Sequence, residues 1–220
     1  MALQRRSLLA GLGGAAFLCS GLPNMAEART VTRTFDIMRG RSRIGSEKLT
    51  VTRNGGAVSV AIDVDIKVRI LGLPAYSYTL RTRENWEGGR LVSLNSKCNA
   101  NGKSDFAKAR ATRSGLKDEG SKSPGTYWAQ GILPRPVWIN TQTGYPMEIQ
   151  ARKVGIVPFP YGGGTTRAAK YRCTGDIGLL DLFYDANGEW IGNEFEVRGQ
   201  KVRFVVASKG AALAPLSPVA

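Results

Sequence analysis

The side chains that could perform acid–base chemistry in this sequence are carboxylates, because its 220 residues include no histidine. Without an imidazole, the chain can form no Ser-His or Cys-His nucleophile pair and offers none of the usual imidazole ligands for zinc or copper. The carboxylates near expected turns are Glu84, Glu87, Asp176, Asp181, Asp185 and Glu189. Their spacing fits an acid–base pair, but it fits turn formation and cross-strand pairing equally well. We therefore predict no catalytic residue and keep a carboxylate enzyme as the minor alternative.

The sequence also predicts no metal and no cofactor. Gly162-Gly163-Gly164 is rich in glycine, as phosphate-binding loops are, but it lacks the Gly-Lys-Ser/Thr ending that brings a lysine to the phosphates. We interpret these glycines as part of a flexible loop.

The first 28 residues have the parts of an export signal. Arg5-Arg6 precedes an apolar run over residues 8–18, and Ala26-Glu27-Ala28 is a small-x-small cleavage site. The arginine pair and the following Ser7-Leu8-Leu9 resemble the twin-arginine consensus, which implies export in the folded state; an ordinary secretory signal is the alternative. We predict cleavage after Ala28, one domain over residues 29–208 and a periplasmic or secreted location.

Two cysteines remain in the predicted mature chain, Cys98 and Cys173, because Cys19 lies within the signal. In an oxidising compartment such a pair is interpreted first as a disulfide, and closing this loop would contribute about 4.5 kcal/mol in the chain-entropy view. Both residues fall at the ends of expected strands, which favours a Cys98–Cys173 bridge. Two separate buried thiols are the alternative.

The clearest structural pattern is the alternation over residues 58–70. Valine or isoleucine occupies every second position, and polar or small residues fill the positions between them. This is the period-2 pattern of a strand with one buried face and one wet face. A strand of this length spans about 43 Å, so the sheet that contains it must coil strongly or close toward a barrel.

The neighbouring segments can be aligned against this strand. Downstream, the turn over residues 71–75 predicts that Ile66 faces Leu80, with Asp65 opposite Arg81 and Asp63 opposite Arg83 on the wet face. Upstream, Asn54-Gly55 is a favoured hairpin dipeptide, which predicts that Val51 faces Val58 and Leu49 faces Val60.

Strand-like runs separated by turn residues cover most of the remaining chain, whereas helical periodicity is almost absent. The runs lie at residues 31–39, 44–53, 58–70, 76–85, 91–98, 103–112, 137–141, 147–154, 168–174, 179–185, 189–197 and 201–207. We predict an all-β fold, a strongly curled antiparallel meander that forms a barrel or half-barrel, with at most one short helix.

Three regions break this pattern. Residues 121–136 have room for one short helix between prolines and carry aromatic side chains. Residues 156–166 are predicted to form a long flexible loop, either an ordinary connection or a lid over a binding mouth. The tail over residues 209–220 is rich in alanine and proline and is predicted to be disordered.

The chain is strongly basic, with a formal net charge of +14 that becomes +13 when Arg5, Arg6 and Glu27 leave with the signal. Most cations fall at alternating or turn positions, as on the wet side of a sheet. A solvated basic face is the simplest interpretation, and attraction to an anionic envelope surface is the alternative. Nucleic acid is not an expected partner outside the cytoplasm.

Several turn and aromatic motifs suggest a family. These are Tyr78-Thr79-Leu80-Arg81, Glu84-Asn85-Trp86, Gly89-Arg90-Leu91, Asn101-Gly102, Tyr127-Trp128, Asn140-Thr141-Gln142-Thr143-Gly144 and Phe183-Tyr184-Asp185. With them the chain, from about Thr34 to Val206, resembles DUF6134, a bacterial family of exported β-proteins of unknown function. The resemblance implies an antiparallel β fold and an envelope location, and it implies no established activity and no functional residue.

A curled sheet with one apolar face and aromatic loops at its mouth is a physically reasonable container for a lipid or another apolar molecule. The side chains expected to contact such a ligand are Tyr76, Tyr78, Trp128, Phe159 and Tyr161. The leading hypothesis is a non-catalytic periplasmic protein that binds an apolar ligand or associates with the envelope. A structural or protein-interaction module is the rival, and an interior filled by its own side chains stays open.

Overall fold

A computed structural model describes residues 28–110, 122–208, 210, 212 and 213 of this protein. The predicted export signal, apart from Ala28, therefore lies outside the described residues, as does most of the predicted disordered tail. Within that tail, however, Leu213 is buried in the hydrophobic core, so the expectation of disorder is wrong for this residue.

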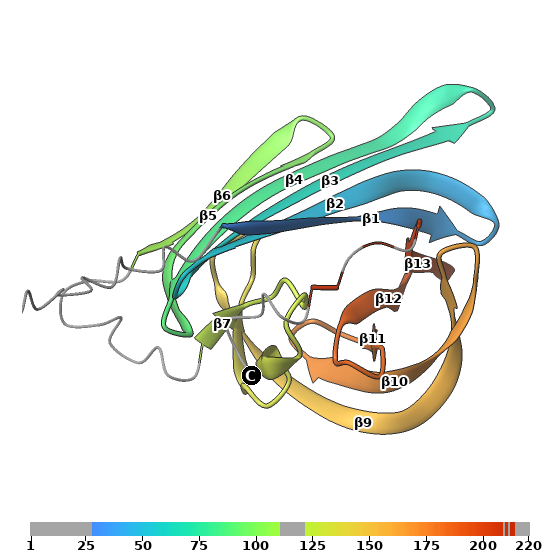
Figure 1. The fold of residues 1–220 in the computed structure, drawn as a ribbon. Coiled ribbons are helices and arrows are strands. Elements are labelled where there is room, and N and C mark those ends of the chain that lie inside the picture. Colours follow the sequence, from blue (N-terminus) through green and yellow to red (C-terminus); the bar gives the residue numbers. More distant parts are fainter. Residues whose placement is uncertain (1–27, 111–121, 209, 211, 214–220) are drawn as a thin grey trace, which may run out of the picture.

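The predicted all-β fold is confirmed, because one curled sheet of 13 strands forms nearly the whole described structure (Figure 1). The strands are β1 (Arg29–Arg39), β2 (Ser42–Asn54), β3 (Ala57–Ile70), β4 (Leu73–Glu87), β5 (Arg90–Ala100), β6 (Lys103–Arg110), β7 (Lys122–Pro124), β8 (Val137–Ile139), β9 (Pro146–Tyr161), β10 (Gly164–Gly175), β11 (Leu180–Tyr184), β12 (Trp190–Val197) and β13 (Gln200–Val206). The short helix expected between the prolines is a single 3-10 turn, η1 (Gln130–Ile132).

The strand order is β6-β5-β4-β3-β2-β1-β13-β12-β11-β10-β9-β8-β7. The pairing of β1 with β13 joins two runs of sequential strands, β1 to β6 and β7 to β13, into one curled sheet. All pairs are antiparallel except β7 with β8. Strands β1 to β6 form a broad upper layer, and β9 to β13 curl beneath it (Figure 1). The apolar faces of both parts point inward.

The register around β3 differs from the predicted one by two residues on each side. Ile66 faces Tyr78 rather than Leu80, and Val60 rather than Val58 faces Val51. The β3–β4 turn is shorter than predicted, because it uses only Leu71-Gly72 of residues 71–75. The β2–β3 turn has the expected two residues but lies one position later, at Gly55-Gly56 instead of Asn54-Gly55. An even shift leaves every side chain on its predicted face.

The predicted charge pairs survive this shift because they form diagonally. Arg81 donates to Asp65 at 2.8 Å, and Arg83 lies 2.8 Å from Asp63. Long arginine side chains can reach the diagonal neighbour on the same face of a sheet. These pairs lie on the wet face and are at least partly exposed, so each contributes at most about 1 kcal/mol.

The predicted flexible loop over residues 156–166 is wrong. β9 and β10 run straight through it, and the chain reverses at Gly162-Gly163, whose φ angles are 53° and 79°. Two consecutive residues with positive φ make the tight turn that suits twisted hairpins, and glycine adopts it without strain. The Gly162 N–H also donates to the Val206 carbonyl oxygen of β13 at 3.0 Å, which fixes the hairpin to the sheet.

Large side chains from both layers occupy the interior. Phe35 and Trp190 pack with ring centroids 4.2 Å apart, and Trp138, Tyr184 and Leu49 are fully buried. A core filled in this way obtains its stability from close packing, so removing methyl groups leaves a cavity that the surroundings fill only partly.

Truncation of the inner face tests this assignment. Leu49→Ala should lower the free energy of unfolding by about 2–5 kcal/mol, because Leu49 is 0% exposed. Leu71→Ala is the matched control, since Leu71 is 99% exposed and should change stability by no more than about 0.5 kcal/mol. Denaturant midpoints of the two variants measure the difference, and equal losses would mean that the inner face is not a packed core.

Candidate functional site

The five residues predicted to contact an apolar ligand do not form one site. Tyr76 and Tyr78 lie on β4, Trp128 lies in the segment between β7 and η1, and Phe159 and Tyr161 lie on β9. Only Trp128 lines the small pocket of the interior, and only Tyr161 lines an open groove beside β1 and β13.

Phe159 supports the fold rather than a binding mouth. Its ring stacks on that of Phe183 with centroids 4.0 Å apart, and it covers Gly192, where any Cβ atom would lie 2.7 Å from the ring. The glycine therefore permits this close approach, which holds β9 against β12. No lid is formed here.

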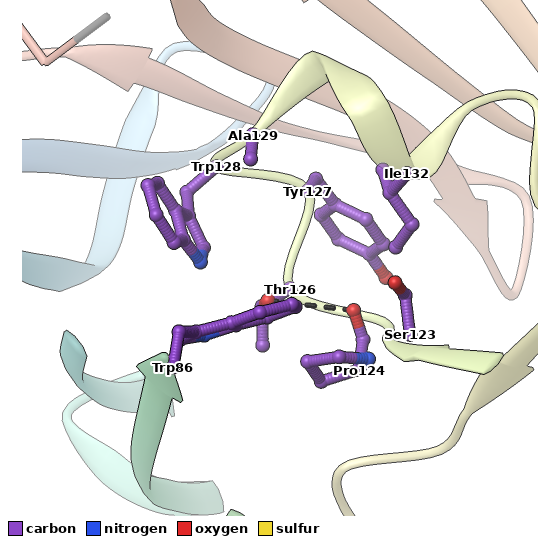
Figure 2. A pocket seen from close by; sticks show the side chains of 8 residues that line it. All are labelled: Trp86, Ser123, Pro124, Thr126, Tyr127, Trp128, Ala129 and Ile132. Atoms are coloured by element: carbon purple, nitrogen blue, oxygen red, sulfur yellow. Dashed lines mark hydrogen bonds between the residues drawn. The ribbon is translucent and has the colours of Figure 1, made fainter. Parts of the chain in front are cut away.

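The interior pocket lies between the end of β4 and the segment that follows β7 (Figure 2). Trp86 and Trp128 border it together with Ser123, Thr126 and Tyr127. Its cavity volume of about 10 Å³ is room for one water molecule. A lipid could enter only if these side chains moved.

A buried carboxyl group stands beside this pocket. Glu84 Oε2 accepts hydrogen bonds from Trp86 Nε1 at 2.8 Å and from Trp128 Nε1 at 3.1 Å. Burial raises the pKa of Glu84, and the hydrogen bonds to the carboxylate only partly oppose the rise. Glu84 thus ties the segment after β7 to β4.

Tyr127 adopts an unusual backbone conformation in the same segment. Its φ of 62° lies in the left-handed region, which is costly for a bulky residue. Two contacts stabilise this conformation. The Tyr127 ring packs with its centroid 5.7 Å from that of Trp138, and the Tyr184 hydroxyl donates to the Tyr127 carbonyl oxygen at 2.9 Å. Burial raises the pKa of Tyr127, and nearby Cys173 and Glu47 add to the rise.

The other candidate carboxylates have structural partners. Buried Glu189 pairs with Arg33 at 2.6 Å, and Asp185 accepts the N–H groups of the turn that it begins. Burial alone would raise the pKa of Asp181, but hydrogen bonds from Arg172 and Lys170 outweigh it and lower the pKa. Asp176 accepts the Glu148 N–H at 2.8 Å. Glu84 lies on the buried face of β4 and Glu87 on the exposed face, so the two carboxyl groups cannot act together on one bond.

The predicted disulfide is not formed in this structure. Cys98 and Cys173 are buried free thiols on β5 and β10, strands that are separated in the sheet by seven others. Burial raises the pKa of both thiols, in the case of Cys173 to about 12, so neither has the thiolate character of a reactive cysteine. Each cysteine lies two residues from the end of its strand, as expected, but the prediction failed because the two strands are far apart in the sheet.

The feature that sequence reasoning missed is the end of the β3–β4 hairpin. The segment over residues 67–77, named here the tip, extends beyond the last partners of both neighbours, since β2 pairs only to Ile66 and β5 only to Tyr78. Ile70, Leu71 and Leu73 at its turn are 58%, 99% and 71% exposed, and Tyr76 is 38% exposed. A bare two-stranded ribbon with three exposed aliphatic side chains is unusual in water. The signal was present in Ile70-Leu71-Gly72-Leu73, where a turn usually carries polar residues.

Within the described ranges there is no group of three or more Asp, Glu or Cys residues placed to hold a metal ion. A search of the same residues found no helix that is long and apolar enough to cross a membrane.

The chain matches DUF6134, a domain of unknown function, over residues 35–207 and belongs to that family. Its fold is similar to that of the β-barrel-like DUF1849 protein of Brucella abortus, with a TM-score of 0.57 and 7% sequence identity. That match covers 81% of this chain and 96% of the other, and at this identity it defines the fold alone. No curated protein matches the sequence.

Buried Glu47 provides a pH test of the inner face. Burial raises the pKa of Glu47 from about 4.5 to about 8, so the folded state favours the protonated form. The stability that protonated Glu47 contributes is complete below about pH 4.5 and is lost as the pH rises through about 8, a loss on the order of 5 kcal/mol. Urea unfolding between pH 5 and pH 8 should show this decline, and Glu47→Gln should flatten most of it, leaving the smaller part that Glu84 contributes. A wild-type protein that gained stability over this range would contradict the assignment.

Thiol counting tests the correction to the disulfide. Protein that begins at Arg29, denatured without reductant, should show two reactive thiols, because Cys98 and Cys173 are free. A count of zero would restore the predicted bridge.

Proposed function

We propose that this protein is an exported, non-catalytic component of the cell envelope that docks on a bilayer surface through the tip. The exposure of Ile70, Leu71 and Leu73 at the end of a projecting hairpin is the observation that carries the proposal. Fully burying a leucine or isoleucine side chain is worth about 1.5–3 kcal/mol, so three of them give a useful affinity for the apolar part of a membrane.

The packed interior supports placing the apolar partner outside the barrel. Trp138, Tyr184 and Trp190 fill the space between the layers, and the pocket beside Trp128 holds about one water molecule. A lipid carried inside would have to displace side chains that now make close contacts. The tip can meet a membrane without any such change.

The local chemistry supports a non-catalytic role. The buried acids Glu84 and Glu189 are held by indole and guanidinium donors, and the thiols of Cys98 and Cys173 have raised pKa values. The two acids are therefore tied to the fold, and the two thiols lack the thiolate character of a nucleophile.

Vesicle co-sedimentation tests the proposal. Protein that begins at Arg29 should sediment with vesicles of phosphatidylethanolamine and phosphatidylglycerol, and Leu71→Asp should weaken binding at least about tenfold, because it replaces a buried leucine by a charge. Ile156→Asp is the matched control, since Ile156 is 56% exposed on β9 and lies outside the tip. It should leave binding unchanged.

An unchanged affinity of Leu71→Asp, or an equal loss for Ile156→Asp, would overturn the proposed docking site. Self-association of the wild-type protein that Leu71→Asp abolishes, without vesicle binding, would instead support the protein-interaction module.

A further inference from the structure

Four other hairpin turns share the end of the sheet at which the tip projects. Three of them carry cations, and the fourth, the β10–β11 turn with Asp176, lies there because β11 is antiparallel to β12. β2 and β5 flank β3 and β4 in antiparallel pairs, so the β1–β2 and β5–β6 turns lie at the same end as the β3–β4 turn. β13 is antiparallel to β1, and Arg39 faces Val202, which brings the β12–β13 turn there as well. We call the segments 39–43, 67–77 (the tip), 101–103 and 197–201 together the basic end.

The basic end carries positive charge only. Its charged residues are Arg39, Arg41, Arg43, Lys67, Arg69, Lys103, Arg198 and Lys201, and these segments contain no aspartate or glutamate. Arg43 pairs with Asp36, and Lys201 lies 3.8 Å from Glu194. The other six form no ion pair within the described part of the chain, and all of these except half-buried Arg39 are exposed.

The opposite ends of the same strands differ. The turns over residues 53–57, 87–90 and 185–189 contain two basic residues, Arg53 and Arg90, and three acidic residues, Glu87, Asp185 and Glu189. Among the hairpin turns, positive charge is thus concentrated at the end that also exposes the apolar tip. A uniformly solvated basic surface would show no such difference between the two ends.

Two of these cations interact with residues of the tip. Arg69 donates to the Gly72 carbonyl oxygen at 3.2 Å across the turn of the tip. Arg198, from the β12–β13 turn, is close enough to Tyr76 to offset part of the rise in tyrosine pKa that burial causes. Apolar side chains at the apex and cations behind them form the arrangement that membrane-surface segments use, because the acyl region lies deeper than the phosphates.

We infer that the partner of the basic end is a bilayer rich in anionic phospholipid, with the tip in the acyl region and the unpaired arginine and lysine side chains on the headgroups. This inference rests on the proposed function and adds the headgroup chemistry to it. Each basic side chain near an anionic surface strengthens binding about fivefold, so several acting together make the interaction selective for acidic lipid. They also make it sensitive to salt.

Two vesicle compositions separate the contributions of the tip and of the charges. Wild-type protein should bind vesicles of phosphatidylcholine with phosphatidylglycerol at least about tenfold more tightly than pure phosphatidylcholine, and raising the salt should remove most of this difference. The double variant Lys67→Glu/Arg69→Glu should lose at least about tenfold on the anionic vesicles and change little on the neutral ones. Arg90→Glu, an exposed cation at the opposite end, is the control and should bind like the wild type on both.

The outcomes distinguish this inference from the proposed function. Equal wild-type affinity for the two compositions, with Leu71→Asp still losing affinity, would overturn the headgroup selectivity and leave the docking site intact. Arg90→Glu changes the net charge by half as much as the double variant. A loss of binding free energy in Arg90→Glu of half that in the double variant, or more, would show that net charge and not the basic end acts, which also overturns the inference. Failure of the wild type to bind either composition would overturn both. The salt series uses unmodified protein, so it tests the headgroup selectivity even if a variant folds poorly.

Discussion

The alternation of valine and isoleucine along β3 is the constraint on which the rest of the structure depends. Because successive side chains of a strand point to opposite faces, this one segment divides its neighbours into an inner and an outer side. Val60 and Ile62 pack inward while Asp63 and Asp65 remain outside, where Arg81 and Arg83 reach them. A shift by one residue would bury the aspartates, which is why the sheet can tolerate only even shifts. The curl that encloses the core follows from the length of these strands and their twist.

Local chemistry was enough to predict the strands, the faces and the all-β class. It was not enough to predict the register, because whether Leu71 and Gly72 form the whole turn depends on how far β3 and β4 stay paired, which no local preference decides. The candidate site was even harder to predict from the sequence. Trp86 and Glu84 meet Trp128 only because a segment more than forty residues later folds against β4, as the 3.1 Å indole–carboxylate bond shows. The glycine triplet was misinterpreted because a two-residue turn and a flexible loop have the same composition.

The packed body of the protein and the hairpin proposed to dock on a membrane are complementary. The interior is stabilised by close packing, by the buried Arg33–Glu189 pair and by the contacts that hold Tyr127 at positive φ. Such a body moves as one unit, so the orientation of the tip is set by the whole sheet and not by a flexible loop. The backbone of the neighbouring turns, which carries the cations, is part of the same sheet. A charged surface that is organised before contact loses little conformational entropy when it binds.

The pairing of β1 with β13 also decides when the molecule can finish folding. Phe35 and Val206 face each other although they lie about 170 residues apart in the chain. The Gly162 N–H donates a hydrogen bond to the carbonyl oxygen of the same Val206. Contacts between residues so far apart in the sequence form slowly, because the chain between them must lose conformational entropy before the contact forms. A ribosome must therefore release nearly the whole polypeptide before the barrel can close. Transport as an unfolded chain would postpone closure to the far side of the membrane, whereas transport in the folded state would have to wait for this last strand.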